Sequence, residues 1–232
     1  MRYALGLVLL LEVGCAPSGA VAPVDGDATP IDLGAGYGMG DYIVPADTTL
    51  TPFLSSDPLR TFDAAGMALT DGRDYFAVME TDVGRIVIDL LEVDTPLAVN
   101  SFVWLALHHF YDGVAFHRVI SGFVAQGGDP NTLDSNSATW GQGGPGYQFA
   151  TEPSPALNFD GAGAVGMART SDPNSNGSQF YITLAATHSL DGKYTLFAHV
   201  TEGLDVLPRI ARGEPPAAPT RMLRVYIADK AR

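Results

Sequence analysis

The chain has 232 residues, of which 46% are hydrophobic, and its formal net charge at pH 7 is −13. This length and this hydrophobic content allow one domain with a sizeable core and do not require a second one. The acidic balance argues against a nucleic-acid-binding protein, because such proteins carry a basic face.

The first 15 residues have the pattern of an export signal. A short basic start is followed by an apolar run at residues 5–11 and by small residues before Cys15, the single cysteine. The run is far shorter than the roughly 20 residues of a membrane-spanning helix. The pattern resembles a bacterial lipoprotein signal, although Glu12 stands where leucine is usual. We therefore expect an exported protein anchored by a lipid on Cys15 and facing the periplasm. The alternative is cleavage after Ala20, which yields a soluble periplasmic or secreted protein.

Residues 16–72 are rich in proline, glycine, aspartate, threonine and alanine and show no helical or strand period. This composition predicts a flexible tether, with short ordered patches near residues 42–44 and 53–54. Partner binding by these patches is an alternative. A chain that begins near Gly72 is accordingly expected to keep full activity.

Residues 73–232 read as one β-rich domain. Runs of β-branched and aromatic residues are separated by turn signals such as Asp82-Val83-Gly84. Eight strands of this length suit a closed antiparallel barrel, which leaves no strand edge exposed. The predicted strands are at 75–81, 85–91, 114–120, 123–126, 163–168, 179–184, 195–200 and 222–228.

Two helices are expected in this domain. Thr95-Pro96 supplies an N-cap and a proline at the first helical position, and the helical segment ends at Asp112-Gly113. The second helix is expected at residues 202–211, where leucine and isoleucine recur at a spacing of three.

The stretch from residue 116 to residue 129 places an arginine and a glutamine among apolar strand formers. Arg118 lies within Phe116-His117-Arg118-Val119-Ile120, and Gln126 ends the run that begins at Phe123. A guanidinium on a largely buried strand needs a partner, for which Gln126 is available. These residues alone support a structural pair and a functional pair about equally. His117 should point to the opposite face from Arg118, as a core histidine with its hydrogen bonds satisfied.

These residues also carry a resemblance. FHRVI-x-GF-x-x-QGGDP resembles the signature of the cyclophilin-type peptidyl-prolyl cis-trans isomerases, and the matching blocks at 143–147, 166–170, 176–180 and 190–194 follow in the family's order. The resemblance spans roughly residues 75–229 and implies a barrel with helices over its open ends. It also implies a monomeric enzyme without cofactor or metal, which rotates X-Pro bonds in unfolded or flexible polypeptides. The competing interpretation is a proline-peptide-binding scaffold with vestigial activity.

The resemblance assigns roles by position. The catalytic residues would be Arg118, Phe123 and Gln126, with Arg118 donating toward the prolyl nitrogen and Gln126 orienting Arg118. The substrate-binding residues would be Val124, Ala168, Arg169, Thr170, Gln179, Tyr181, Ser189, Leu190 and Tyr194.

Three departures from the best-known family pattern bear on binding. Ser189 stands where an aromatic ring contacts cyclosporin, so weak cyclosporin binding is expected. The hydroxyl of Tyr181 needs a partner or access to water. The loop 130–142 is longer than usual, with Trp140 exposed or folded over the binding groove.

Literal matches to cofactor and metal motifs do not hold in context. Residues 141–146 fit GxGxxG, but no strand precedes them and prolines block the required helix. Residues 172–177 fit half of a calcium loop that lacks its final glutamate. His108 and His109 are adjacent, so they cannot share one helix face as zinc ligands.

Overall fold

The computed structural model describes residues 42–232. The predicted signal, Cys15 and the first part of the predicted tether lie outside these residues. Within the described part of the chain, no helix is long and apolar enough to cross a membrane.

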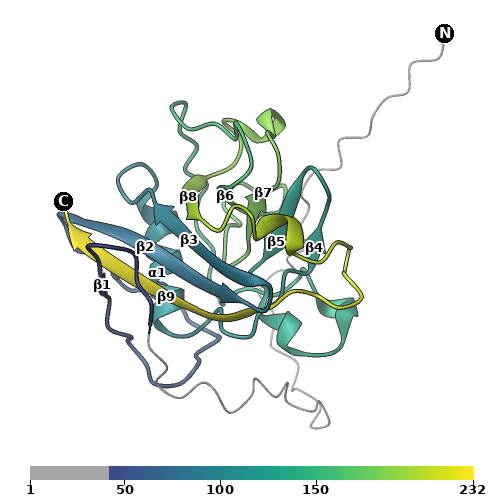
Figure 1. Ribbon diagram of the computed structural model, residues 1–232, viewed down its shortest axis with the longest axis horizontal. Helices are drawn as coiled ribbons and strands as arrows, with labels where there is room; N and C mark the ends of the chain where they lie inside the picture. Colours follow the sequence, from purple (N-terminus) through teal and green to yellow (C-terminus); the bar gives the residue numbers. More distant parts are fainter. Residues whose placement is uncertain (1–41) are drawn as a thin grey trace.

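One antiparallel sheet organises the domain, in the order β1-β9-β2-β3-β8-β6-β7-β5-β4 (Figure 1). Each of the eight predicted strand ranges overlaps one of β2 to β9, which confirms a mainly β antiparallel fold. No strand is predicted at the position of β1. The strands are β1 (Thr49–Leu50), β2 (Arg73–Thr81), β3 (Gly84–Leu90), β4 (Arg118–Val119), β5 (Val124–Gly127), β6 (Ala164–Met167), β7 (Phe180–Thr183), β8 (Leu196–Glu202) and β9 (Met222–Ala231).

The predicted closed barrel of eight strands is wrong, because the sheet has nine strands and does not close. Its ends are β1 and β4. Only isolated bridges join this region to the segment before β9, from Val119 of β4 to Gly213 and from Ala115, which precedes β4, to Arg221. The predicted strand at 114–120 is reduced to the two residues of β4. In the part before β4, the Ala115 amide donates to the hydroxyl of Thr132 and not to a neighbouring strand.

The first predicted helix is present as α1 (Pro96–Leu107), which packs against β9 and β8. It ends before Asp112 because His109 adopts a positive φ of 57°. Thr95 holds the N-cap position without a capping side-chain bond. The carboxylate of Glu152 caps instead, accepting from the amides of Leu97 and Ala98 at 3.0 and 2.8 Å.

The second predicted helix, at residues 202–211, is wrong. Strand β8 continues to Glu202, the chain turns at Gly203 with a φ of 87°, and one 3-10 turn follows at Leu207–Arg209. Pro208 has no amide proton and disfavours helical geometry at the preceding residue, so the spacing of apolar residues is not enough to make a helix. The other 3-10 turns are Pro130–Leu133, Ser137–Thr139 and His188–Leu190.

The tether prediction is wrong for residues 42–72, which pack against the domain. Strand β1 pairs with β9, and both lie at the same edge of the sheet in Figure 1. The side chains of this segment cover three fully buried residues of the sheet, Val78, Val87 and Tyr226. The covering residues are Tyr42, Val44, Leu50 and Phe53.

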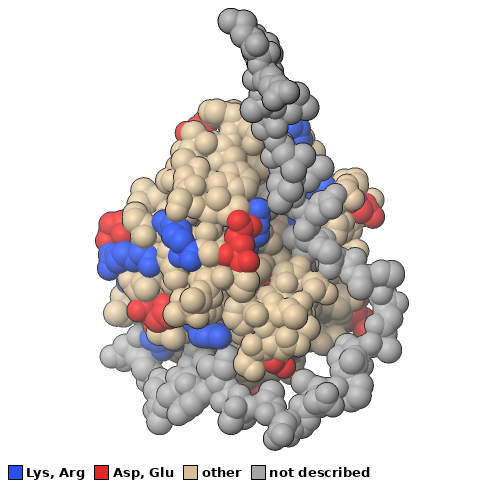
Figure 2. Space-filling view, turned by 90° about the vertical axis from the view of Figure 1, so that its right-hand side faces the viewer, with Lys and Arg blue, Asp and Glu red and all other residues tan. Residues whose placement is uncertain are grey.

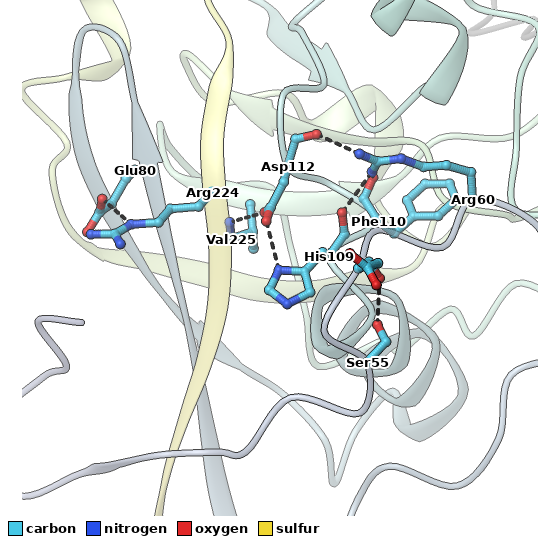
Figure 3. Close-up of polar contacts among 9 residues, drawn as sticks. Ser55, Arg60, Glu80, His109, Phe110, Asp112, Arg224 and Val225 are labelled. Atoms are coloured by element: carbon cyan, nitrogen blue, oxygen red, sulfur yellow. Dashed lines mark hydrogen bonds and ion pairs between the residues drawn. The ribbon is translucent and has the colours of Figure 1, made fainter. Parts of the chain in front are cut away.

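Arg60 fastens the same segment to the end of the α1 region (Figure 3). Its guanidinium donates to the carbonyl oxygens of His109 at 2.8 Å and Asp112 at 2.9 Å, and also to that of Phe110. The Asp112 carboxylate in turn accepts from the His109 ring and from the Val225 amide, at 2.9 and 2.8 Å. Residues 42–72 are therefore part of the folded domain.

Candidate active site

Arg118 and Gln126 face each other across the hairpin of β4 and β5, as Cα partners. Gly122, with a φ of 69°, makes the tight turn between the two strands that the sequence predicts. The side chains of Arg118 and Gln126 nevertheless do not form the predicted pair, because each has another hydrogen-bond partner. Arg118 Nε donates to Glu214 Oε2 at 2.8 Å, while its Nη1 is buried and has no hydrogen-bond partner within residues 42–232.

Gln126 belongs to a chain of amide hydrogen bonds. Its Nε2 donates to Gln179 Oε1 at 3.0 Å, and Gln179 Nε2 donates to the Gly143 carbonyl at 2.8 Å. Both glutamine side chains are buried, so these bonds fix their orientation. The structure thus brings together Gln126 and Gln179, both predicted site residues, and links them to the loop that ends at Gly143.

Six of the predicted residues gather in one apolar cluster, separate from the main core, which we call the β5–β7 cluster. Phe123 is half-buried and the others are almost fully buried. Phe159 joins them, which the sequence reasoning missed because no matching block contains it. The predicted members are Phe123, Val124, Ala168, Tyr181, Leu190 and Tyr194.

The hydroxyl of Tyr181 is buried and has no hydrogen-bond partner among the described residues. It lies over Gly166, where any side chain would overlap it. Burial raises the pKa of Tyr181 well above its ordinary value of 10.0. The hydroxyl therefore stays protonated, and its hydrogen-bonding capacity is unused among the described residues.

Arg169 and Thr170 lie beside this cluster. The Arg169 guanidinium donates to the carbonyls of Thr170 and Lys193, both at 2.8 Å, and stacks 4.6 Å from the centre of the Tyr194 ring. Ser189, which directly precedes Leu190, is exposed. Weak cyclosporin binding at Ser189 stays a prediction.

The loop 130–142 is folded around the buried side chain of Asp129. This carboxylate accepts from the amides of Asn131, at 2.8 Å, and of Gly141. Burial raises the pKa of Asp129, and these backbone hydrogen bonds act in the opposite direction. Trp140 is half-buried, with its Nε1 donating to the Asp134 carbonyl within the same loop at 3.1 Å.

His117 is buried as predicted, but its hydrogen bonds are not satisfied. Neither ring nitrogen has a partner of good geometry among the described residues. Burial lowers the pKa of His117 from 6.5 to about 4, and the charge of the adjacent Arg118 acts in the same direction.

We therefore expect His117 to make the fold sensitive to acid. Below pH 6.5 the unfolded chain binds a proton at this ring that the folded chain does not bind, so the free energy of unfolding falls as the pH falls towards 4. The loss at this site amounts to about 3 kcal/mol. Urea denaturation of the wild type and of His117→Leu across this range checks it. The variant should lose less stability than the wild type, and parallel losses would contradict the assignment.

Glu214 is a second residue that the sequence reasoning missed. It lies in a Gly-Glu-Pro-Pro turn that reads as an ordinary exposed loop, far along the chain from Arg118. Within residues 42–232, no group of three or more His, Asp, Glu or Cys side chains is placed to hold a metal ion.

Comparisons with known proteins bear on this arrangement. Residues 76–228 match the family described as cyclophilin type peptidyl-prolyl cis-trans isomerase/CLD. A peptidyl-prolyl cis-trans isomerase of Helicobacter pylori is 38% identical over 160 residues, which cover 68% of this chain and 92% of that protein. The peptidyl-prolyl cis-trans isomerase-like 1 of Rhizopus delemar is 43% identical over 136 residues, covering 57% of this chain and 78% of that protein.

A solved structure agrees in fold. The cyclophilin type isomerase of Cryptosporidium parvum, crystallised in the presence of the dipeptide Ala-Pro, superposes with a TM-score of 0.60 and 30% sequence identity. The alignment covers 66% of this chain and 98% of that chain. The chain described here therefore belongs to the cyclophilin-type family and is a peptidyl-prolyl cis-trans isomerase.

Proposed function

We propose that Arg118, Phe123 and Gln126 carry the isomerisation, with the β5–β7 cluster holding the proline ring. The observation that supports this most is that Arg118 Nη1 is buried and has no partner among the described residues. Arg118 lies on β4, which pairs with β5, and β5 contributes Val124 to that cluster. A charged donor left without a partner at such a place is costly, unless a ligand supplies the acceptor.

The chemistry asks for modest stabilisation. Rotation about the bond before proline meets a barrier of about 18–20 kcal/mol, because the C–N bond has partial double-bond character. An acceleration of about 10⁵ requires a reduction of about 7 kcal/mol. A charge-assisted hydrogen bond from Arg118 to the prolyl nitrogen supplies roughly 1.5–3 kcal/mol of this. The nitrogen lone pair becomes localised only as the amide twists, so the bond favours the transition state over the ground state.

The remaining stabilisation comes from holding and desolvating the substrate. The proline ring would pack on Phe123, the half-buried aromatic member of the β5–β7 cluster, while the preceding carbonyl rotates. Gln126 contacts the substrate carbonyl, and its bond to Gln179 fixes its orientation. Arg169, Thr170 and Gln179 meet the residues before proline. Loss of isomerisation in Arg118→Ala is the direct test of this assignment.

We further propose that the enzyme acts on exported proteins and is anchored to the cell envelope through a lipid on Cys15. The support is the basic start, the short apolar run and the small residues before the single cysteine. A lipid on one cysteine would keep the domain at a membrane surface, where unfolded exported chains are met.

In cells of a bacterium that carries out lipoprotein processing, the wild-type protein is expected in the membrane fraction. A Cys15→Ser variant with a cleavable signal should be released in soluble form. Mass spectrometry of the mature N-terminus checks the modification directly. An unmodified N-terminus at Val21 on a soluble protein would replace the anchored form with the secreted one.

A further inference from the structure

We propose that Glu214 is a positioning residue for Arg118. The Glu214 carboxylate accepts from Arg118 Nε at 2.8 Å. The Arg118 side chain is 18% exposed, whereas that of Glu214 is 52% exposed. In this ion pair the carboxylate is therefore solvated and the guanidinium is largely buried.

The backbone holds Glu214 at this place. Val119 and Gly213 exchange two hydrogen bonds, from the Val119 amide at 2.8 Å and from the Gly213 amide at 3.0 Å. Arg118 directly precedes Val119, and Glu214 directly follows Gly213, so this bridge brings the two residues of the ion pair together. Gly213 has a φ of 147°, and a Cβ there would lie 2.6 Å from the Cα of Pro216, so the turn has no room for a side chain at this residue. The turn thus presents Glu214 to Arg118 from a fixed distance.

The atom that Glu214 binds determines what it can do. A guanidinium is planar, so a carboxylate on Nε restricts rotation about the end of the side chain. It occupies the edge that Nε shares with Nη2 and leaves Nη1 on the other edge. Nη1 is the buried donor without a partner. Fixing Nε from outside therefore aims Nη1 inwards before any substrate binds. Such pre-orientation lowers the barrier because the donor does not have to be ordered during the reaction.

An exposed ion pair without a functional role contributes little to stability, typically about 0–1 kcal/mol, and nothing to catalysis. The two possibilities differ in kinetics. A positioning residue should change kcat, because Arg118 acts in the transition state, and should leave KM nearly unchanged. The inference rests on the proposed role of Arg118.

In the full-length protein, Glu214→Ala is expected to lower kcat about three- to tenfold and to change KM less than about twofold. Glu214→Gln keeps an acceptor oxygen at the same reach and should recover most of the loss. Asp205→Ala is the matched control, because Asp205 forms a similar exposed pair with Arg209. It should leave both constants unchanged.

A double-mutant cycle isolates the coupling. In an Arg118→Ala background, Glu214→Ala should have almost no further effect on kcat, because its target is gone. An equal loss in both backgrounds, an unchanged kcat in the single variant, or a loss confined to KM would overturn the positioning role. Full activity in Arg118→Ala would instead contradict the proposed function, so the two failures are distinguishable. Urea denaturation of each variant shows whether a loss of kcat has another cause, since the positioning role predicts an unchanged folded fraction under assay conditions.

Discussion

Replacement of Arg118 by alanine is expected to lower kcat/KM at least about tenfold while the fold stays intact. A lost charge-assisted hydrogen bond of about 1.5–3 kcal/mol corresponds to a factor of roughly ten to more than a hundred. Arg118 lies at the end of the sheet in a two-residue strand, and its side chain makes one ion pair, with the half-exposed Glu214. Its removal should therefore cost little stability. A protease-coupled or NMR-exchange assay on an X-Pro peptide measures the loss.

Arg232→Ala is the control for this variant. Arg232 also forms an ion pair, with Glu92, but it follows β9 directly, and β9 and β4 lie towards opposite ends of the sheet. Its replacement should leave kcat/KM unchanged. Exchange rates near those of the wild type in Arg118→Ala would contradict the assignment of Arg118 as the amide-facing donor.

Deletion of residues up to 72 is expected to destabilise the domain strongly, in contrast to the expectation from the sequence. The shortened chain exposes Val78, Val87 and Tyr226, and it loses the pairing of β1 with β9. At about 1.5–3 kcal/mol for each large apolar side chain that is buried, the loss reaches at least about 4 kcal/mol. For a domain of this size the melting temperature should fall by about 10 °C. Thermal and urea denaturation of the shortened chain measure both quantities.

A chain that begins at residue 42 is the matched control for this deletion. It keeps every contact in Figure 3 and should melt like the full-length protein. Arg60→Ala in that chain removes the donors to the carbonyls of His109, Phe110 and Asp112, and it should cause part of the loss. Equal melting temperatures for chains that begin at residues 42 and 73 would contradict the integration of this segment into the domain.

The sequence was most informative where local chemistry decides the structure. The turn at Gly122 and the helix start at Pro96 were predictable, because a positive φ and a first-turn proline are properties of single residues. The helix predicted at 202–211 is absent because Pro208 outweighs the spacing of the apolar residues. The prediction of a flexible tether is wrong at residues 42–72 because their packing on β9, β2 and β3 has no periodic pattern.

In the site, too, the sequence predicted some features and missed others. Position within or directly beside matching blocks was enough to place six residues in one apolar cluster. The partner of Arg118 was not predictable, because Gln126 is close in sequence and opposite in register, whereas Glu214 arrives through the bridge between Val119 and Gly213. Long-range backbone pairing sets that contact, and no local pattern encodes it.

The side of the molecule that carries β4 and β5 has few charged side chains where it can be seen. Figure 2 turns this side towards the viewer, and in the part drawn in colour the acidic and basic side chains are scattered, singly or in pairs, among uncharged residues. A proline-containing segment without charge could approach such a surface at little desolvation cost.

Two-dimensional NMR exchange on an Ala-Pro peptide, with the protein present in catalytic amounts, measures whether the chain isomerises an X-Pro bond through Arg118. Exchange cross-peaks between the cis and trans forms are expected with the wild type and should be nearly absent with Arg118→Ala. With isotope-labelled protein, peptide-induced amide shifts should concentrate at Phe123, Gln126 and Gln179. Shifts at these residues without accelerated exchange would contradict catalysis by Arg118 and would indicate a proline-peptide-binding scaffold with vestigial activity.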